Sequence, residues 1–211
     1  MTMTVDIRSI MGRGPVIPVV TIDNPTTAPD LARALLVSGI SVIELTLRTP
    51  GALEAARLIA EQVEEMVVGV GTVLDPSQAV QAAEVGAVFA VSPGFDPDLL
   101  TAVSAAGLAY LPGVQTASEV MAARKAGLRA LKFFPAASSG GADALKQLQP
   151  VFPDIAFCPT GGISLQDAPA YLALENVLCI GGSFAAPARF IQTRDWMAIT
   201  GSARQACALR G

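Results

Sequence analysis

One unit repeats along this chain: an apolar run rich in β-branched residues, a few turn residues, and an alanine-rich stretch with helical spacing. The apolar runs are continuous, which is typical of parallel strands that are buried on both faces. The eight strand-like runs occupy residues 16–22, 42–48, 67–73, 87–93, 109–114, 130–136, 155–161 and 177–183. The helical stretches lie near residues 28–38, 52–63, 76–84, 97–106, 117–126, 142–149, 166–173 and 193–208.

Eight such units predict an α/β protein folded as a (β/α)8 TIM barrel, in which the strands close on themselves inside a ring of helices. A doubly wound open sheet is the alternative. No linker or low-complexity segment interrupts residues 1–211, so we expect a single domain. Before the first unit, a short leader containing Val5, Ile7, Ile10 and Met11 predicts one or two helical turns.

Composition excludes several function classes. The net charge of -4 comes without a basic patch, so we expect a small-molecule partner and no nucleic acid. The chain has no histidine, which removes the Ser-His-Asp and Cys-His arrangements and the usual zinc ligand sets. We therefore expect neither a catalytic metal nor a cofactor.

The three cysteines, Cys158, Cys179 and Cys207, lack metal-ligand spacing, and two of them fall inside apolar runs. They are interpreted as reduced core residues, which fits a cytoplasmic location. The N-terminus has no secretory pattern, and the longest uncharged window is broken by glycine and proline, so we expect no membrane segment.

Lys132 lies in the sixth apolar run, within the sequence Arg129-Ala-Leu-Lys-Phe-Phe-Pro-Ala136. Burial of an ammonium is costly, so a lysine placed there reaches solvent along its stem, pairs with an anion, or becomes a neutral amine. A neutral amine in an apolar pocket is the nucleophile of Schiff-base enzymes. The other two lysines, Lys125 and Lys146, lie on charged or amphipathic helical stretches, so Lys132 is the candidate for such chemistry.

Polar residues gather where the second and third predicted strands end, and active sites of barrels form at these carboxyl ends. Two-residue periodicity places Glu44, Thr46 and Arg48 on one face, which we expect to point into the barrel. Glu44 and Arg48 are therefore candidates for the site, with a buried ion pair as the alternative. Thr72 follows two glycines and offers a hydroxyl there.

Two glycine-rich turns follow the seventh and eighth predicted strands. They contain Gly161-Gly162 and Gly181-Gly182-Ser183. Barrels often bind phosphate with the backbone amides of these two loops, where glycine permits close approach. The pair of turns predicts a phosphate-binding cradle.

These residues lie in motifs that resemble the 2-keto-3-deoxy-6-phosphogluconate aldolase / 4-hydroxy-2-oxoglutarate aldolase family along nearly the whole chain. The matching segments are residues 44–49, 70–74, 92–94, 111–113, 132–136, 158–163 and 179–183. The resemblance implies a class I aldolase: a homotrimer of (β/α)8 barrels that uses no metal. It also implies the reaction, cleavage of 2-keto-3-deoxy-6-phosphogluconate to pyruvate and glyceraldehyde 3-phosphate, and possible action on 4-hydroxy-2-oxoglutarate.

The resemblance also implies roles for individual residues. Lys132 matches the Schiff-base lysine, and Glu44 matches the general acid/base. Arg48 and Thr72 match the residues that hold the carboxylate of the keto acid. The phosphate end is matched by Gly161, Gly162, Gly182 and Ser183, and the pocket lining by Pro93, Phe134 and Thr160. The chain departs from many family members at position 137, where alanine replaces glutamate.

Other functions remain open at this point. The aldolase for the galactonate epimer of the same substrate is the nearest alternative. A phosphosugar isomerase or epimerase on the same barrel would share the glycine cradle but would not need the amine of Lys132. A barrel that binds a phosphorylated acid without catalysis is a third alternative, because a fold alone does not fix function.

Overall fold

The computed structural model describes residues 6–210, and every strand pairing in this part of the chain is parallel. The strands are β1 (Val16–Val20), β2 (Val42–Thr46), β3 (Val67–Gly71), β4 (Phe89–Val91), β5 (Ala109–Leu111), β6 (Gly113–Val114), β7 (Ala130–Phe133), β8 (Ala156–Pro159) and β9 (Ile180–Gly182). Each lies inside one of the predicted apolar runs.

The strands form a six-stranded sheet in the order β5-β4-β3-β2-β1-β9 and a three-stranded sheet in the order β6-β7-β8. The predicted run 109–114 is divided into β5 and β6 because Pro112 has no backbone N–H to contribute to a ladder. The Pro112 carbonyl still accepts a hydrogen bond from the backbone N–H of Lys132, at 2.8 Å. At the other edge of the smaller sheet, Thr160 forms an isolated parallel bridge with Gly181.

Helices alternate with the strands, which confirms an α/β fold. They are α1 (Ile7–Met11), α2 (Ala28–Leu36), α3 (Ala52–Gln62), α4 (Pro76–Glu84), α5 (Pro97–Ala105), α6 (Ala117–Lys125), α7 (Gly141–Leu148), α8 (Ala168–Leu172), α9 (Ala188–Gln192) and α10 (Trp196–Cys207). The short helix α9 and the 3-10 turns at Pro25–Thr27, Ala137–Ser139 and Ser183–Ala185 were not predicted from the sequence. No helix in residues 6–210 is both long enough and apolar enough to span a bilayer.

Several helices begin with the signals that the sequence predicts. The side chains of Asp75 and Asp96 accept hydrogen bonds from the first backbone N–H groups of α4 and α5. A proline follows each aspartate at the first helical position, where the missing N–H costs nothing. These caps fix where the chain turns from a strand into the covering helix.

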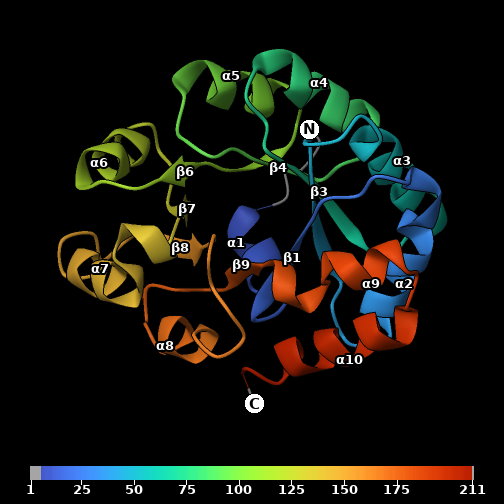
Figure 1. Cartoon of the computed structure of the whole chain (residues 1–211). Helices are drawn as coiled ribbons and strands as arrows, with labels where there is room; N and C mark the ends of the chain where they lie inside the picture. The colour runs from blue at the N-terminus through green and yellow to red at the C-terminus, as the bar shows by residue number, and fades with distance from the viewer. Residues whose placement is uncertain (1–5, 211) are drawn as a thin grey trace.

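The strands have an apolar core on each face. The larger core packs the outward side chains against the helices, and the smaller one contains Ile17, Val42 and Phe89 together with Ile10 and Met11 of α1. Figure 1 shows α2 to α8 and α10 around the strands and α1 near the centre. The helix in the predicted leader therefore packs against the inner face of the strands, whereas Val5 lies outside the described residues.

Glycine at position 69 makes room for the inner core. A Cβ on Gly69 of β3 would collide with the ring of Phe89, which is fully buried on the neighbouring strand β4. By contrast, a Cβ on Gly201, in the interior of α10, would meet nothing within 4 Å. The two glycines therefore differ in what an alanine would do.

We predict opposite effects of alanine at these two positions. Gly69→Ala should lower the free energy of unfolding by about 1–3 kcal/mol because Phe89 cannot move without leaving its rotamer or its core contacts. Gly201→Ala should raise it by about 0.5–1 kcal/mol because alanine is the better helix former. Urea unfolding followed by circular dichroism measures both, and equal effects of the two substitutions would contradict the packing described.

Candidate active site

The inner face of the strands carries a buried ion pair. Lys132 of β7 is 6% exposed and Glu44 of β2 is 3% exposed. The Nζ atom of Lys132 donates a hydrogen bond to Oε1 of Glu44 over 3.2 Å. The two residues are 88 positions apart in the sequence, and the fold brings the candidate nucleophile and the candidate acid/base into direct contact.

Neighbouring residues shape the surroundings of this pair. A Cβ on Gly71 of β3 would collide with the carboxylate of Glu44, so the glycine provides the space that the glutamate occupies. The ring centroid of Phe134 lies 5.3 Å from Nζ of Lys132, which is within cation–π range. Lys132 therefore has one anionic partner and one aromatic neighbour, and it does not reach solvent along its stem.

Such a pair has a chemical use. The carboxylate of Glu44 is positioned to take a proton from Lys132, which would free the amine for attack on a carbonyl. The same carboxylate can then move protons on the bound carbonyl compound. The arrangement therefore contains side chains of the types needed for a nucleophile and a proton shuttle.

A cavity of about 380 Å³ opens beside Phe134 at the carboxyl ends of β1, β8 and β9. Seven of the predicted site residues line it: Arg48, Phe134, Thr160, Gly161, Gly162, Gly182 and Ser183. Residues far apart in the sequence thus meet where the sequence analysis expects the site. Phe134 connects the two parts because it lines the cavity and also contacts Lys132.

Arg48 differs from its prediction in one respect. The two-residue periodicity holds through Thr46, where β2 ends, and the following backbone turns, with the N–H of Arg48 donating to the carbonyl of Thr46 at 2.8 Å. Arg48 is consequently exposed at the cavity wall and does not point into the inner core. Among residues 6–210 it has no ion-pair partner, so its guanidinium is available to an anion.

In the two glycine turns, the backbone adopts conformations and close contacts that a larger residue would not permit. Gly161 and Gly162 have φ angles of 99° and 76°, in the left-handed region that favours glycine. A Cβ on Gly181 would collide with the hydroxyl of Thr160. Because glycine has no Cβ, β9 can lie directly against Thr160 at the end of β8. Gly182 ends β9, and Ser183 begins the following 3-10 turn at the cavity wall.

Thr72 and Pro93 lie at the ends of β3 and β4 but do not line this cavity. Thr72 has a φ angle of 60°, which is strained for a β-branched residue and is often found at functional sites. Pro93 is held by Ser92, whose hydroxyl donates to the carbonyl of Gly94 at 2.6 Å and pairs with the hydroxyl of Tyr110 at 2.7 Å. Burial raises the pKa of Tyr110 to about 12, so this phenol stays protonated.

The cavity also contains residues that the sequence analysis missed. Thr21, Ile163, Ala188 and Ile191 line it, and the last two belong to the unpredicted helix α9. Thr21 follows the apolar run of β1 directly, so the rule that polar residues at strand ends are functional could have identified it. The residues of α9 carry no comparable signal.

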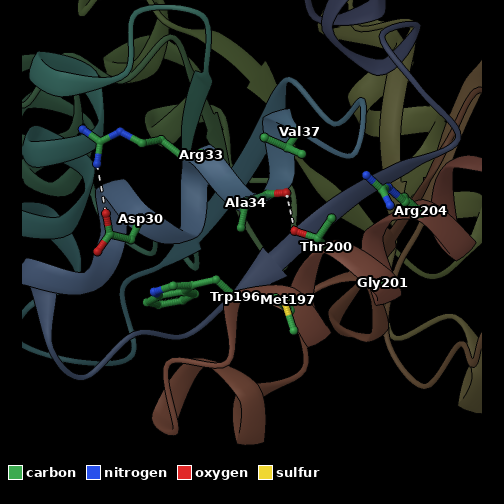
Figure 2. Close-up of a pocket in the computed structure, with 9 residues that line it drawn as sticks. All are labelled: Asp30, Arg33, Ala34, Val37, Trp196, Met197, Thr200, Gly201 and Arg204. Atoms are coloured by element: carbon green, nitrogen blue, oxygen red, sulfur yellow. Dashed lines mark hydrogen bonds and ion pairs between the residues drawn. The ribbon is translucent and has the colours of Figure 1, made fainter.

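A larger groove, of about 600 Å³, lies elsewhere, between α2 and α10. Figure 2 shows its walls, which include Val37, Trp196 and Met197, and the exposed ion pair between Asp30 and Arg33. It contains neither a lysine nor a buried acid. We therefore assign the chemistry to the smaller cavity beside Lys132, although the groove is larger.

Other reactive groups are not arranged for catalysis. Hydrogen bonding to Cys158 and burial raise the pKa of the Cys179 thiol, and burial raises the pKa of Cys207, so both stay protonated. In residues 6–210, no group of three or more His, Cys, Asp or Glu side chains is placed to hold a metal ion. The Lys132–Glu44 pair and the cavity beside it remain as the candidate site.

Comparison with known proteins gives one consistent result. The family model of KDPG and KHG aldolase matches residues 7–202. The 2-dehydro-3-deoxy-phosphogluconate aldolase of Dickeya dadantii is 46% identical over 201 residues, which cover 95% of this chain and 94% of the relative.

Two solved structures are also similar. The KDPG aldolase of Legionella pneumophila, with pyruvate captured as a covalent carbinolamine intermediate, is 39% identical with a TM-score of 0.94 and coverage of 96% and 98%. The 2-keto-3-deoxy-6-phosphogluconate aldolase of Zymomonas mobilis ZM4, with 3-phosphoglycerate, is 45% identical with a TM-score of 0.92 and coverage of 97% and 96%.

We predict that the two members of the buried pair depend on each other for stability. Lys132→Met should lower the free energy of unfolding by about 3–5 kcal/mol because it leaves the carboxylate of Glu44 buried and unpaired. Lys132→Met with Glu44→Leu should recover most of this loss, since no charge then remains in the apolar interior. Urea unfolding measures the difference, and Lys146→Met on the exposed face of α7 is the matched control. A double variant no more stable than the single one would contradict the prediction.

Proposed function

The chain belongs to the KDPG and KHG aldolase family and is an aldolase, and we propose that it cleaves 2-keto-3-deoxy-6-phosphogluconate to pyruvate and glyceraldehyde 3-phosphate with Lys132 as the Schiff-base nucleophile. The observation that carries this proposal is the contact of 3.2 Å between Nζ of Lys132 and Oε1 of Glu44, both buried beside the cavity. The family also includes aldolases for 4-hydroxy-2-oxoglutarate, which has the same reacting atoms and is a second substrate in this proposal.

The reaction begins when the amine of Lys132 attacks the C2 ketone of the substrate. The carbinolamine loses water to give an iminium ion, which is an electron sink for the neighbouring carbon–carbon bond. Glu44 removes the proton of the C4 hydroxyl, the C3–C4 bond breaks, and glyceraldehyde 3-phosphate leaves an enamine on Lys132. Protonation of the enamine at C3 and addition of water release pyruvate and regenerate the lysine.

The exposed guanidinium of Arg48 would hold the carboxylate at C1 of the substrate. Its planar fork can form two parallel hydrogen bonds, which would orient C2 toward Lys132. Thr72 is the second residue proposed for this end, and its strained backbone supports a functional role. Pro93 is proposed as part of the pocket wall once a substrate is bound.

At the other end of the cavity, the turns containing Gly161, Gly162, Gly182 and Ser183 would hold the phosphate. Backbone amides on glycine turns are suited to phosphate because no side chain blocks the approach. The structure of the Zymomonas mobilis relative contains a phosphorylated acid, 3-phosphoglycerate, which supports a phosphate subsite in this family. Phe134 and Thr160 line the space between the two ends.

The remaining alternatives are less well supported. Identities near 45% with enzymes named for the gluconate substrate favour it over the galactonate epimer. An isomerase or epimerase would not need a buried lysine in contact with a buried glutamate.

The finer features of the fold belong to this proposal as well. We propose that the strands close as a (β/α)8 barrel that spans residues 1–211 as one domain. Closure requires the two sheets to meet at both of their edges. At one edge, Thr160 bridges to Gly181 of β9, and at the other only Pro112 separates β5 from β6, so both edges support the proposal. We further propose a cytoplasmic homotrimer, in which the free cysteines Cys158, Cys179 and Cys207 stay reduced.

Covalent trapping tests the nucleophile. Incubation with pyruvate and borohydride should add the mass of a reduced three-carbon acid to a peptide that contains Lys132, because reduction makes the imine permanent. Mass spectrometry of the digested protein identifies the site. Label on Lys125 or Lys146, or no label at all, would refute the proposed mechanism.

Substrate phosphate tests the glycine cradle. A substrate without phosphate should lose at least about tenfold in kcat/KM, since one charge-assisted contact is worth about 1.5–3 kcal/mol. Gly162→Ala should erase most of this preference, because the φ angle of 76° and the nearby Cβ of Ala137 resist a side chain there. Imine trapping with pyruvate, which has no phosphate, reports whether the variant is still folded. Equal turnover of both substrates by the unmodified enzyme would show that the turns do not bind phosphate.

A further inference from the structure

Thr21 is a polar residue of the cavity to which the family resemblance assigns no role. It follows the last residue of β1, is exposed, and lines the cavity that also contains Arg48 and Gly182. It also lines a second cavity of about 220 Å³ that shares Ala188 and Ile191 with the first. Thr21 therefore borders two cavities.

The hydrogen bonds of Thr21 define what its hydroxyl can still offer. Its Oγ1 lies 2.8 Å from Oγ1 of Thr46, a buried residue of β2. The Thr46 hydroxyl has one proton, which can go to the carbonyl of Val20 at 3.2 Å or to Thr21 Oγ1 at 2.8 Å. In either case Thr21 Oγ1 keeps a lone pair that these contacts do not use, so it can accept a hydrogen bond from a further donor.

The strand order places this acceptor between the two ends of the substrate. In the sheet, β1 lies between β2, whose exit carries Arg48, and β9, which ends with Gly182. A substrate that spans from the Arg48 side to the glycine turns therefore passes the end of β1, where Thr21 lies. The donors available on the middle of such a chain are its hydroxyl groups, since phosphate and carboxylate oxygens accept hydrogen bonds at neutral pH.

We propose that Thr21 Oγ1 accepts a hydrogen bond from the substrate hydroxyl next to the phosphate-bearing carbon, which is the C5 hydroxyl of 2-keto-3-deoxy-6-phosphogluconate. This inference rests on the proposed function, in which the C4 hydroxyl gives its proton to Glu44 deeper in the site. Thr21 is then a specificity-determining residue for hydroxylated aldehydes, and Thr46 is the positioning residue that sets the direction of its hydroxyl.

The reverse reaction tests this contact directly. The C2 hydroxyl of glyceraldehyde 3-phosphate becomes the C5 hydroxyl of the product, and 3-phosphopropanal is the same aldehyde without that hydroxyl. Condensation of each with pyruvate gives the ratio of the two kcat/KM values. Thr21→Val should lower this ratio by roughly two- to tenfold, as expected for one neutral hydrogen bond. Thr21→Ser, which retains the hydroxyl, should keep the ratio of the unmodified enzyme.

Thr101→Val on the exposed face of α5 is the matched control for loss of a threonine hydroxyl. An unchanged ratio in Thr21→Val, or an equal fall in kcat/KM for both aldehydes, would overturn the inference, because a structural role does not distinguish the two aldehydes. Failure of the proposed function is recognised separately: pyruvate and borohydride would then not label Lys132 in the unmodified enzyme.

Discussion

The ion pair between Lys132 and Glu44 is the interaction on which the rest of the site depends. Two charges removed from water are tolerated only when they contact each other, and here the contact joins strands that are 88 residues apart in the sequence. Gly71 leaves room for the carboxylate, and Phe134 covers the ammonium side. Both side chains are almost fully buried, on the face of the strands whose apolar core includes Ile10 and Met11 of α1, and this burial limits the access of water to the pair.

The order of the strands brings together, in one cavity, residues proposed to bind the two charged ends of the substrate. Parallel strands bring their carboxyl ends to the same side, so the exits of β2, β1 and β9 are adjacent although these strands end at residues 46, 20 and 182. In the proposed function, Arg48 would bind one end of the substrate and the glycine turns would bind the other. The reacting carbons would then lie near the buried Lys132–Glu44 pair, which would supply the chemistry, while the exposed residues would orient the substrate.

The sequence predicted the parts of the site that depend on local pattern. A lysine inside an apolar run and two glycine turns after strands are visible without a structure, and Lys132, Gly161 and Gly162 lie where they were expected. Arg48 lies beyond the end of β2 at Thr46, where the backbone is no longer a strand, and it is exposed, but it still lines the candidate cavity. Thr21 was missed although it directly follows β1, and its contact with Thr46, 25 residues away, could not be predicted because the pairing of β1 with β2 is what brings the two residues together.

Backbone hydrogen bonds join the loop after β7, the strand that carries Lys132, to the loop after β8. The N–H of Ala136 donates to the carbonyl of Thr160 at 2.8 Å, and the N–H of Ala137 donates to that of Gly161 at 3.0 Å. The segment that follows Lys132 is therefore bonded to the turn proposed to hold the phosphate. If this turn binds phosphate as proposed, these two hydrogen bonds would pass part of the binding energy of a remote group to the end of β7, next to the amine. Position 137, where the family resemblance breaks, lies within this connection, because the N–H of Ala137 forms one of the two hydrogen bonds.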